Sequence, residues 1–174
     1  VDGTGIANGL EILLKGNVGK MQGWLSYSYS QIEKTVNGIT YPPKYDRPHD
    51  LDLVLNYQIT KKWSIGSRFV YHSGTPFTQI IGYMRQPLYE DFRTGSYPYE
   101  IEVYGARNAW RYPDYHRLDI NFVKQYSWRS HPMEFYIDLV NVYARLNVLA
   151  YAEHNDTWIQ MPPLATIGIR GKIW

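Results

Sequence analysis

The stretch that most constrains the fold runs from His49 to Thr60 and reads HDLDLVLNYQIT. Its apolar side chains fall on one parity and its polar side chains on the other, with Val54 as the only apolar residue on the polar parity. Successive side chains of a β-strand point to opposite faces, so this pattern predicts a strand with one apolar and one polar face. A tilted strand of about 9–11 residues is long enough to cross the hydrocarbon of a bilayer. A soluble sheet can show the same alternation, so the rest of the chain is needed to distinguish a membrane-spanning β-protein from a soluble one.

Further segments repeat the two-faced pattern and predict an all-β chain that folds as an antiparallel up-and-down sheet of about seven strands. They cover residues 9–15, 21–32, 63–73, 116–126, 133–143 and 165–174. If these strands cross a membrane, the residues on the apolar parity face lipid: Leu51, Leu53, Leu55, Phe69, Leu118, Ile120, Phe122, Phe135 and Ile137. Asn141 also falls on that parity, which predicts either a β-bulge or the end of the lipid-facing part of its strand.

The composition agrees with a β-barrel in a membrane. The 17 Tyr, 6 Trp and 5 Phe make up 16% of the chain, and such rings collect at membrane interfaces. The mean hydropathy of −0.42 fits a barrel as well, because every second residue of a barrel strand meets water. No apolar run is long enough for a transmembrane helix, and only a closed barrel would then span the bilayer. The net charge of +2 gives no reason to expect a nucleic-acid partner.

The connections between the predicted strands alternate in length. Those near residues 16–20, 60–62 and 127–132 are short, and those near 34–48, 74–115 and 144–163 are long. This asymmetry is typical of outer-membrane barrels, as is a girdle of aromatic residues, here predicted from Trp24, Trp63, Trp128 and Trp174 near the short turns. Within the segment 74–115, the ranges 78–84 and 99–104 are predicted to pair as a tall hairpin. An up-and-down bacterial barrel needs an even number of strands, so we expect the chain to be the end of a larger barrel.

Four segments occur in an order and spacing that is known from one family. They are YDRPHDL at residues 45–51, RYPDYHRLD at 111–119, Asn141-Val142-Tyr143 followed by Asn147, and the ending from Pro163 to Trp174 with its Ile167-Gly168-Ile169. Together they resemble the last third of the barrel of the TonB-dependent outer-membrane receptors. The chain departs from the family pattern at Ala144, where Asn or Asp is usual, and at Trp174, where Phe is usual.

The resemblance implies that residues 1–174 are the C-terminal portion of a 22-stranded barrel, from which the N-terminal plug and the earlier strands are absent. It further implies a place in the cell outer membrane and a role as an active-transport receptor that imports a scarce nutrient such as a siderophore, cobalamin or a glycan. The implied partners are outer-membrane lipid, the missing plug and strands, the TonB complex acting through the plug, and the insertion machinery acting on the C-terminal strand. The imported ligand is not indicated.

The segment from Gly74 to Tyr115 is the best candidate for ligand contact, because aromatic residues alternate there with arginines. Aromatic rings stack on sugars or aromatic chelators, and arginine pairs with carboxylates in a bidentate manner. We therefore predict that Arg107, Trp110 and Arg111 contact the ligand. The alternative is that the aromatic residues only stiffen a long loop.

No catalytic or metal site is expected, and we predict that the protein is not an enzyme and holds no cofactor. Asp46, Arg47, His49 and Asp50 are close in sequence, but neighbouring side chains of a strand point to opposite faces, so structural ion pairs and hydrogen bonds are expected of them. The five His are widely separated, and the chain has no Cys, no phosphate-binding loop and no nucleophile elbow. An outer-membrane hydrolase therefore lacks a credible catalytic set.

Two alternatives remain open. A complete eight-stranded barrel with a structural or adhesive role has about this length, and it requires an eighth strand before Gly9 or within residues 74–115. A secreted β-sandwich that binds carbohydrate through its aromatic residues requires the apolar faces of two sheets to pack together.

Overall fold

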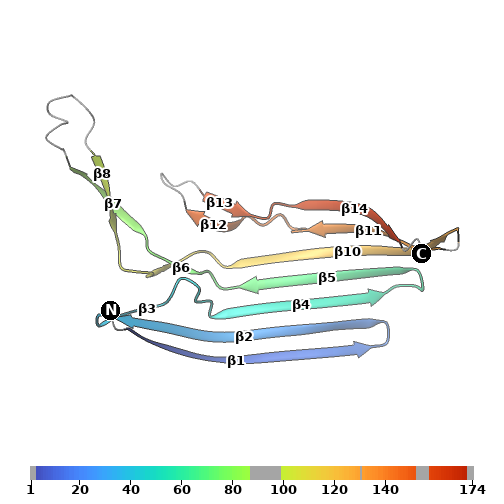
Figure 1. Cartoon of the computed structure of the whole chain (residues 1–174). Coiled ribbons are helices and arrows are strands. Elements are labelled where there is room, and N and C mark those ends of the chain that lie inside the picture. Colours follow the sequence, from blue (N-terminus) through green and yellow to red (C-terminus); the bar gives the residue numbers. More distant parts are fainter. Residues whose placement is uncertain (1–2, 87–98, 130, 152–156, 172–174) are drawn as a thin grey trace. The chain divides into compact units, whose positions relative to one another are not determined.

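The computed structural model describes residues 3–86, 99–129, 131–151 and 157–171 (Figure 1). All of the regular elements in these residues are β-strands, which confirms the all-β prediction. No helix that could cross a membrane occurs in this part of the chain. The chain divides into two compact units, unit 1 with residues 1–7, 32–46 and 75–111, and unit 2 with residues 8–31, 47–74 and 112–174.

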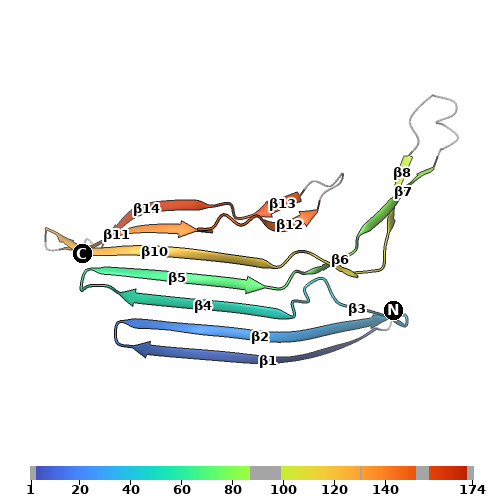
Figure 2. The ribbon, with the colours of Figure 1, turned by 180° about the vertical axis from the view of Figure 1, so that it is seen from behind.

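The main sheet is an antiparallel meander in which each long strand pairs with the next long strand along the chain (Figures 1 and 2). This arrangement confirms the predicted up-and-down order. Its strands are β1 (Gly3–Val18), β2 (Met21–Val36), β4 (His49–Gln58), β5 (Trp63–His72), β10 (Tyr115–Trp128), β11 (His131–Val140) and β14 (Leu164–Gly171), with the short β3 (Ile39–Tyr41) paired to the end of β2.

The sheet is open over the described residues. β1 and β14 lie at the two ends of the strand order and do not pair with one another. The strands β7 (Ile80–Gln86) and β8 (Tyr99–Tyr104) pair with each other in a separate sheet, so this hairpin supplies no eighth strand to the meander. A closed eight-stranded barrel is therefore not formed by the part of the chain that the structure describes.

The cross-strand register separates two faces of the main sheet. Leu53 lies opposite Leu25 and Phe69, and Phe69 lies opposite Leu118. Directly opposed residues of an antiparallel pair share a face, so these side chains form one surface, here called the apolar face. The same register carries this face across the sheet, and it holds every residue predicted above to face lipid: Leu51, Leu53, Leu55, Phe69, Leu118, Ile120, Phe122, Phe135 and Ile137.

The opposite parity forms the polar face, which carries Asp52, Arg68, Asp119 and Asp138. Trp24 lies opposite Val54 on this polar face, whereas Trp63 lies opposite Lys124 on the apolar face. The predicted girdle is therefore wrong for Trp24, because its parity in β2 is that of the serines. Trp174 lies outside the described residues.

The main sheet has almost no buried apolar core. Among the described aliphatic and aromatic side chains, proline not counted, only Tyr41 and Val123 are buried, with 8% of each exposed. The β-sandwich alternative requires two apolar faces packed on each other, and the described residues contain no such dry centre. Leu53, Phe69, Phe122 and Phe135 all lie on the apolar face and remain partly exposed.

Two predicted boundaries were wrong for local reasons. The strand predicted over residues 133–143 ends at Val140, because Asn141 takes a φ of +56° that does not continue a strand. Asn141 is therefore not a bulge within its strand, and the alternative that the strand leaves lipid at this residue stays a prediction. The connection 144–163 was expected to be a loop, but β12 (Asn147–Tyr151) and β13 (Thr157–Gln160) pair within it, with a register shift between Val148 and Ala150.

Unit 1 contains the hairpin that was predicted within residues 74–115. β7 pairs with β8 in antiparallel register from Ile80 opposite Tyr104 to Gln86 opposite Tyr99. Next to it in the chain, β6 (Pro76–Phe77) pairs with β9 (Trp110–Arg111). The hairpin starts two residues later than expected, at Ile80, and residues 87–98 lie outside the description.

Candidate functional site

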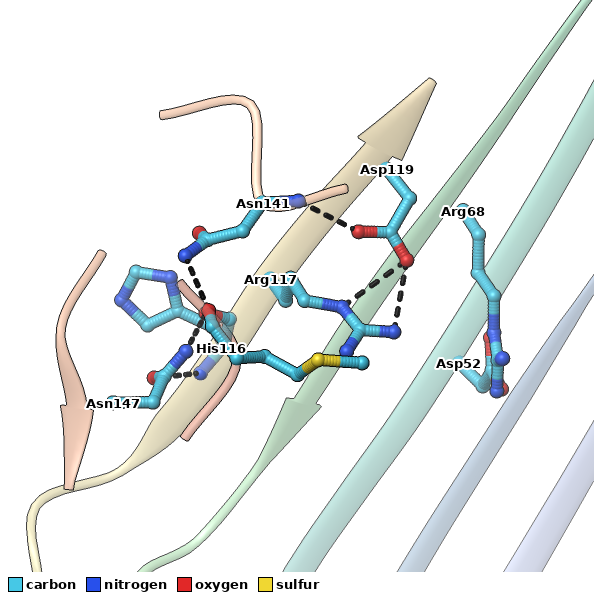
Figure 3. A network of polar contacts seen from close by, with 8 residues as sticks. Asp52, Arg68, His116, Arg117, Asp119, Asn141 and Asn147 are labelled. Carbon is cyan, nitrogen blue, oxygen red and sulfur yellow. Dashed lines mark hydrogen bonds and ion pairs between the residues drawn. The ribbon is translucent and has the colours of Figure 1, made fainter. Parts of the chain in front are cut away.

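A row of alternating charges crosses the polar face from β4 to β10. Arg68 Nη2 lies 2.5 Å from Asp52 Oδ2, and Arg68 is directly opposite Asp119 in the register. Arg117 Nη2 in turn lies 2.9 Å from Asp119 Oδ2 (Figure 3). Because each charge has a neighbour of opposite sign, the row stays hydrophilic without strong net repulsion.

The polar contacts continue across the next strand pairs. Asn121 Nδ2 donates to Asp138 Oδ1 at 2.6 Å, which joins β10 to β11. Arg170 Nε donates to Glu134 Oε2 at 2.5 Å, which joins β14 to β11. Side-chain contacts on the polar face therefore join β4 to β5, β10 to β11 and β11 to β14, while Arg68 and Asp119 lie opposite one another on β5 and β10. The chemistry of this face suits contact with water.

Asn141 forms a buried polar junction where β11 ends. Its side chain is fully buried, and its backbone N–H donates to Asp119 Oδ1 at 2.9 Å (Figure 3). Its Nδ2 donates to the carbonyl oxygens of Arg145 and Met161 at 2.9 and 3.0 Å, and its Oδ1 accepts from the Arg145 N–H at 3.1 Å. One amide thus satisfies three backbone groups of the connection that follows β11.

Asn147 performs a similar task at the start of β10. With 2% of its surface exposed, it donates from Nδ2 to the His116 carbonyl at 3.0 Å and accepts at Oδ1 from the His116 N–H at 3.1 Å. An amide that bonds both backbone groups of one residue replaces a strand partner. These two hydrogen bonds hold the start of β12 against the start of β10.

Asp114 fixes the point where the chain returns to the main sheet. The Tyr71 hydroxyl donates to Asp114 Oδ2 at 2.8 Å, and the Gly74 N–H donates to Oδ1 at 3.0 Å. The Tyr71 hydrogen bond is the largest cause that lowers the pKa of the Asp114 carboxyl, and the Gly74 N–H adds to it. A Cβ on Gly74 would meet the Tyr112 carbonyl oxygen at 1.6 Å, so this approach requires glycine.

The predicted ligand contacts all lie in unit 1, and two of them contact the segment 41–46. Arg111 forms an ion pair with Asp46 and donates from Nη1 to the Asp46 carbonyl at 3.2 Å. The guanidinium of Arg107 lies 4.3 Å from the centroid of the Tyr41 ring. Trp110 is 54% exposed on β9. Arg111 therefore has a structural partner, and ligand contact by the three residues stays a prediction.

Asp46 and Asn108 hold the same part of unit 1 together. Asp46 is 2% exposed and accepts from the Ile32 N–H at 3.1 Å, in addition to its pair with Arg111. Asn108 is 3% exposed, donates from Nδ2 to the Pro42 carbonyl at 2.8 Å, and takes a φ of +52°. Asn108 thus binds the backbone of the loop that carries Tyr41, and Asp46, which belongs to the same loop, joins it to β2 and β9.

Asp46, His49 and Asp50 have separate partners in the structure. Asp46 is engaged with Arg111, whereas His49 Nδ1 lies 2.8 Å from the Tyr27 hydroxyl. Asp50 lies on the polar face opposite His72. These separate partners agree with the structural role expected for the group. Within the described ranges, no three His, Asp or Glu side chains come together in a way that would hold a metal ion.

The sequence pattern missed the buried amides. The sequence marks Asn141 by its place on the apolar parity and in a motif, marks Asn147 only as part of that motif, and gives no signal for Asn108. Asn tolerates positive φ better than most residues, and Asn108 and Asn141 both use that property. The signal that could have found Asn141 is a single Asn on the apolar parity of a predicted strand, whereas Asn147 lies in a predicted loop and gives no such signal.

Comparisons with known protein families, with curated proteins and with solved structures found no match to this chain.

Proposed function

We propose that the chain is part of the wall of a transmembrane β-barrel, at the C-terminal end of a TonB-dependent receptor of the outer membrane. The observation that carries the proposal is the two-faced meander. One face of the main sheet is apolar and partly exposed, and the other is linked by ion pairs and hydrogen bonds.

The apolar side chains of the apolar face must be shielded from water, and the hydrocarbon of a bilayer can shield the whole face. Ile167 and Ile169 of β14 are 67% and 62% exposed, and Leu55 of β4 is 37% exposed. An apolar surface that runs over several strands is larger than a soluble monomer normally exposes, and such surfaces mark membrane or protein contacts. In a bilayer, the open edges at β1 and β14 require further strands, because unpaired backbone groups are costly there.

The polar face then lines a water-filled interior. The charge row through Asp52, Arg68 and Asp119 is stable in water and would be costly in hydrocarbon. The three short turns share one end of the main sheet, while the long connections leave from the other end (Figures 1 and 2). That division corresponds to periplasmic turns and extracellular loops in barrels of this kind.

The role in transport is receptor and passage for a scarce nutrient, with the energy supplied by the TonB complex through a plug. Arg107 and Trp110 are the ligand contacts that we favour in unit 1. Trp110 offers a ring that is more than half exposed, and Arg107 keeps its charge beside the Tyr41 ring. Arg111 supports them through its pair with Asp46.

The test of location uses the full-length protein in its Gram-negative host. We expect it to fractionate with the outer membrane, to require detergent for extraction, and to migrate differently on gels with and without heating, as folded barrels do. Recovery from the soluble fraction without detergent would contradict the proposal and favour a soluble β-protein.

The test of transport uses a deletion strain grown with iron chelates, cobalamin or oligosaccharides as the limiting nutrient. We expect slower growth on one of these classes, and the same loss when the TonB complex is inactivated. Trp110→Ala should then reduce uptake of that compound, whereas Trp158→Ala, which alters a similarly exposed ring on β13, should not. Equal loss in both variants would remove Trp110 from the ligand site.

A further inference from the structure

The end of the main sheet that carries the short turns is rich in cations. Residues 19–20, 59–62 and 129 form the described parts of these turns and contain Lys20, Lys61, Lys62 and Arg129 but no Asp or Glu. We call this end, together with the adjoining residues Trp63, Lys124 and Trp128, the turn-side rim. Its charge is one-sided, unlike the alternating row in the middle of the polar face.

Two cations of the turn-side rim lie over tryptophan rings. Lys124 Nζ is 5.1 Å from the centroid of the Trp63 ring, and Arg129 Cζ is 5.0 Å from the centroid of the Trp128 ring. The two tryptophans are 40% and 57% exposed. Such pairs keep an apolar ring and a cation together at the same depth.

The register shows that the first pair lies on the apolar face. Lys124 is opposite Trp63 on β5 and opposite Phe135 on β11, which follow the same parity as Phe122. The carboxylate of Glu134 lies on the other face and is bound by Arg170. Among the described contacts of Lys124 and Arg129, no carboxylate neutralises either charge.

A lysine at the edge of an apolar surface is stable when its stem packs on that surface and its ammonium group reaches an anion in water or in the headgroup layer. Tryptophan prefers the same layer, because its ring is amphipathic. Phosphate oxygens accept hydrogen bonds from both ammonium and guanidinium groups. The charge and the position of the two pairs therefore complement the phosphate of a lipid headgroup.

We propose that the turn-side rim binds anionic phospholipid headgroups of the adjoining leaflet, with Lys124 beside Trp63 and Arg129 beside Trp128 as the two contact points. Lys61 and Lys62 add positive potential at the turn between β4 and β5. This inference rests on the proposed function, because it requires the apolar face to meet a bilayer.

The test uses the full-length protein reconstituted into vesicles in which either phosphatidylglycerol or phosphatidylcholine carries brominated chains near the headgroup. Bromine quenches tryptophan, and subtracting the signal of a Trp63→Phe, Trp128→Phe variant isolates the two rim tryptophans. We expect the brominated phosphatidylglycerol to quench them about fivefold more effectively at low salt, since each cation near a membrane surface favours anionic lipid by about that factor. The preference should fall as salt shortens the Debye length from about 30 Å to about 3 Å.

In the double variant Lys124→Gln, Arg129→Gln, both brominated lipids should still quench the two rim tryptophans, but phosphatidylglycerol should no longer quench them more effectively than phosphatidylcholine. Lys44→Gln, which removes an exposed charge from unit 1, is the matched control and should behave like the unaltered protein. Equal quenching by the two lipids in the unaltered protein would overturn the rim inference and leave the membrane location intact. No quenching by either lipid would instead contradict the proposed function.

Discussion

The two faces of the main sheet are built from the same strands and differ only in parity. Around Leu53, the apolar face presents Leu25, Phe69 and Leu118, which offer no polar group to a neighbouring strand. One residue away, Asp52 binds Arg68, and Arg68 faces Asp119. Because the backbone ladder is common to both faces, the side chains alone decide which face can meet hydrocarbon and which can meet water.

The comparison also explains where polar groups are buried. Except for Lys124, the strands of the main sheet from β4 to β14 place their described charges on a face that stays accessible, whereas Asn141 and Asn147 are buried at the ends of strands and bind backbone groups there. Charges of the main sheet thus remain in contact with solvent and neutral amides take the dry positions, while the buried carboxylate of Asp46 in unit 1 is paired with Arg111. This division follows from the much higher cost of burying a charge than of burying a paired amide.

The largest effect is expected from placing a charge on the apolar face. Leu53→Arg or Phe122→Arg should lower the free energy of unfolding by about 2–4 kcal/mol, because both residues lie in the middle of their strands. Asp52→Lys on the polar face should cost about 1 kcal/mol or less, since it loses only a partly exposed ion pair. Urea titration of the protein folded in vesicles measures all three, and equal costs would break the distinction between the faces.

A smaller loss is expected at the buried junction. Asn141→Ala should destabilise the fold by about 1–3 kcal/mol, because backbone groups of Arg145 and Met161 lose their partner. Asn141→Gly loses the same bonds but accepts the positive φ, and should be about 1 kcal/mol less harmful. If the two variants unfold alike, the backbone conformation contributes nothing and the side-chain bonds explain the whole effect.

The charge row should contribute less. Arg68→Gln removes the ion pair with Asp52. Because the Arg68 side chain is 51% exposed, the loss should lower the free energy of unfolding by only about 0.2–1 kcal/mol. The cost should shrink as salt is raised, because exposed charges are screened. Unfolding titrations at low and high salt measure it, with Ser67→Ala on the apolar parity of β5 as a salt-independent control. A salt-independent loss of several kcal/mol would show that the polar face is dry.

The smallest expected effect depends on pH. The pKa of Asp114 is lowered from its ordinary value of 3.8, first by the Tyr71 hydroxyl. The ionised carboxylate therefore adds stability at neutral pH, and this contribution is lost as the pH falls below about 4 and through the lowered pKa. Because the group is exposed, we expect only a few tenths of a kcal/mol. The gap between the unaltered protein and Asp114→Asn should begin to close near pH 4 and keep closing as the pH falls further, and a gap that widens toward acid would contradict the assignment.

Most of the main sheet follows from the sequence, because a period of two is a strong signal over ten residues and a slip of one residue would exchange the faces. Lys124 interrupts this period, because it is a charged residue on the apolar parity. Only the structure explains its place there, by the contact of its ammonium group with the Trp63 ring. The hairpin of β12 and β13 was missed because its strands are short and shift register between Val148 and Ala150.

The candidate site is less predictable than the sheet. The prediction of Arg107, Trp110 and Arg111 came from composition, whereas the pairing of Arg111 with Asp46 joins residues far apart in the chain. Asn108 and Pro42 are likewise distant in sequence and bonded in the structure. A periodic pattern describes one strand at a time and carries no information on such contacts.

The most direct test places single nitroxide labels along residues 50–57 of the full-length protein in vesicles, since this chain has no cysteine of its own. Collision with oxygen reports lipid exposure, and collision with a water-soluble nickel chelate reports contact with water. We predict high oxygen accessibility at positions 51, 53, 55 and 57 and high nickel accessibility at positions 50, 52 and 56. Low accessibility to both reagents at Leu53, or the absence of a period of two, would contradict a wall between lipid and water.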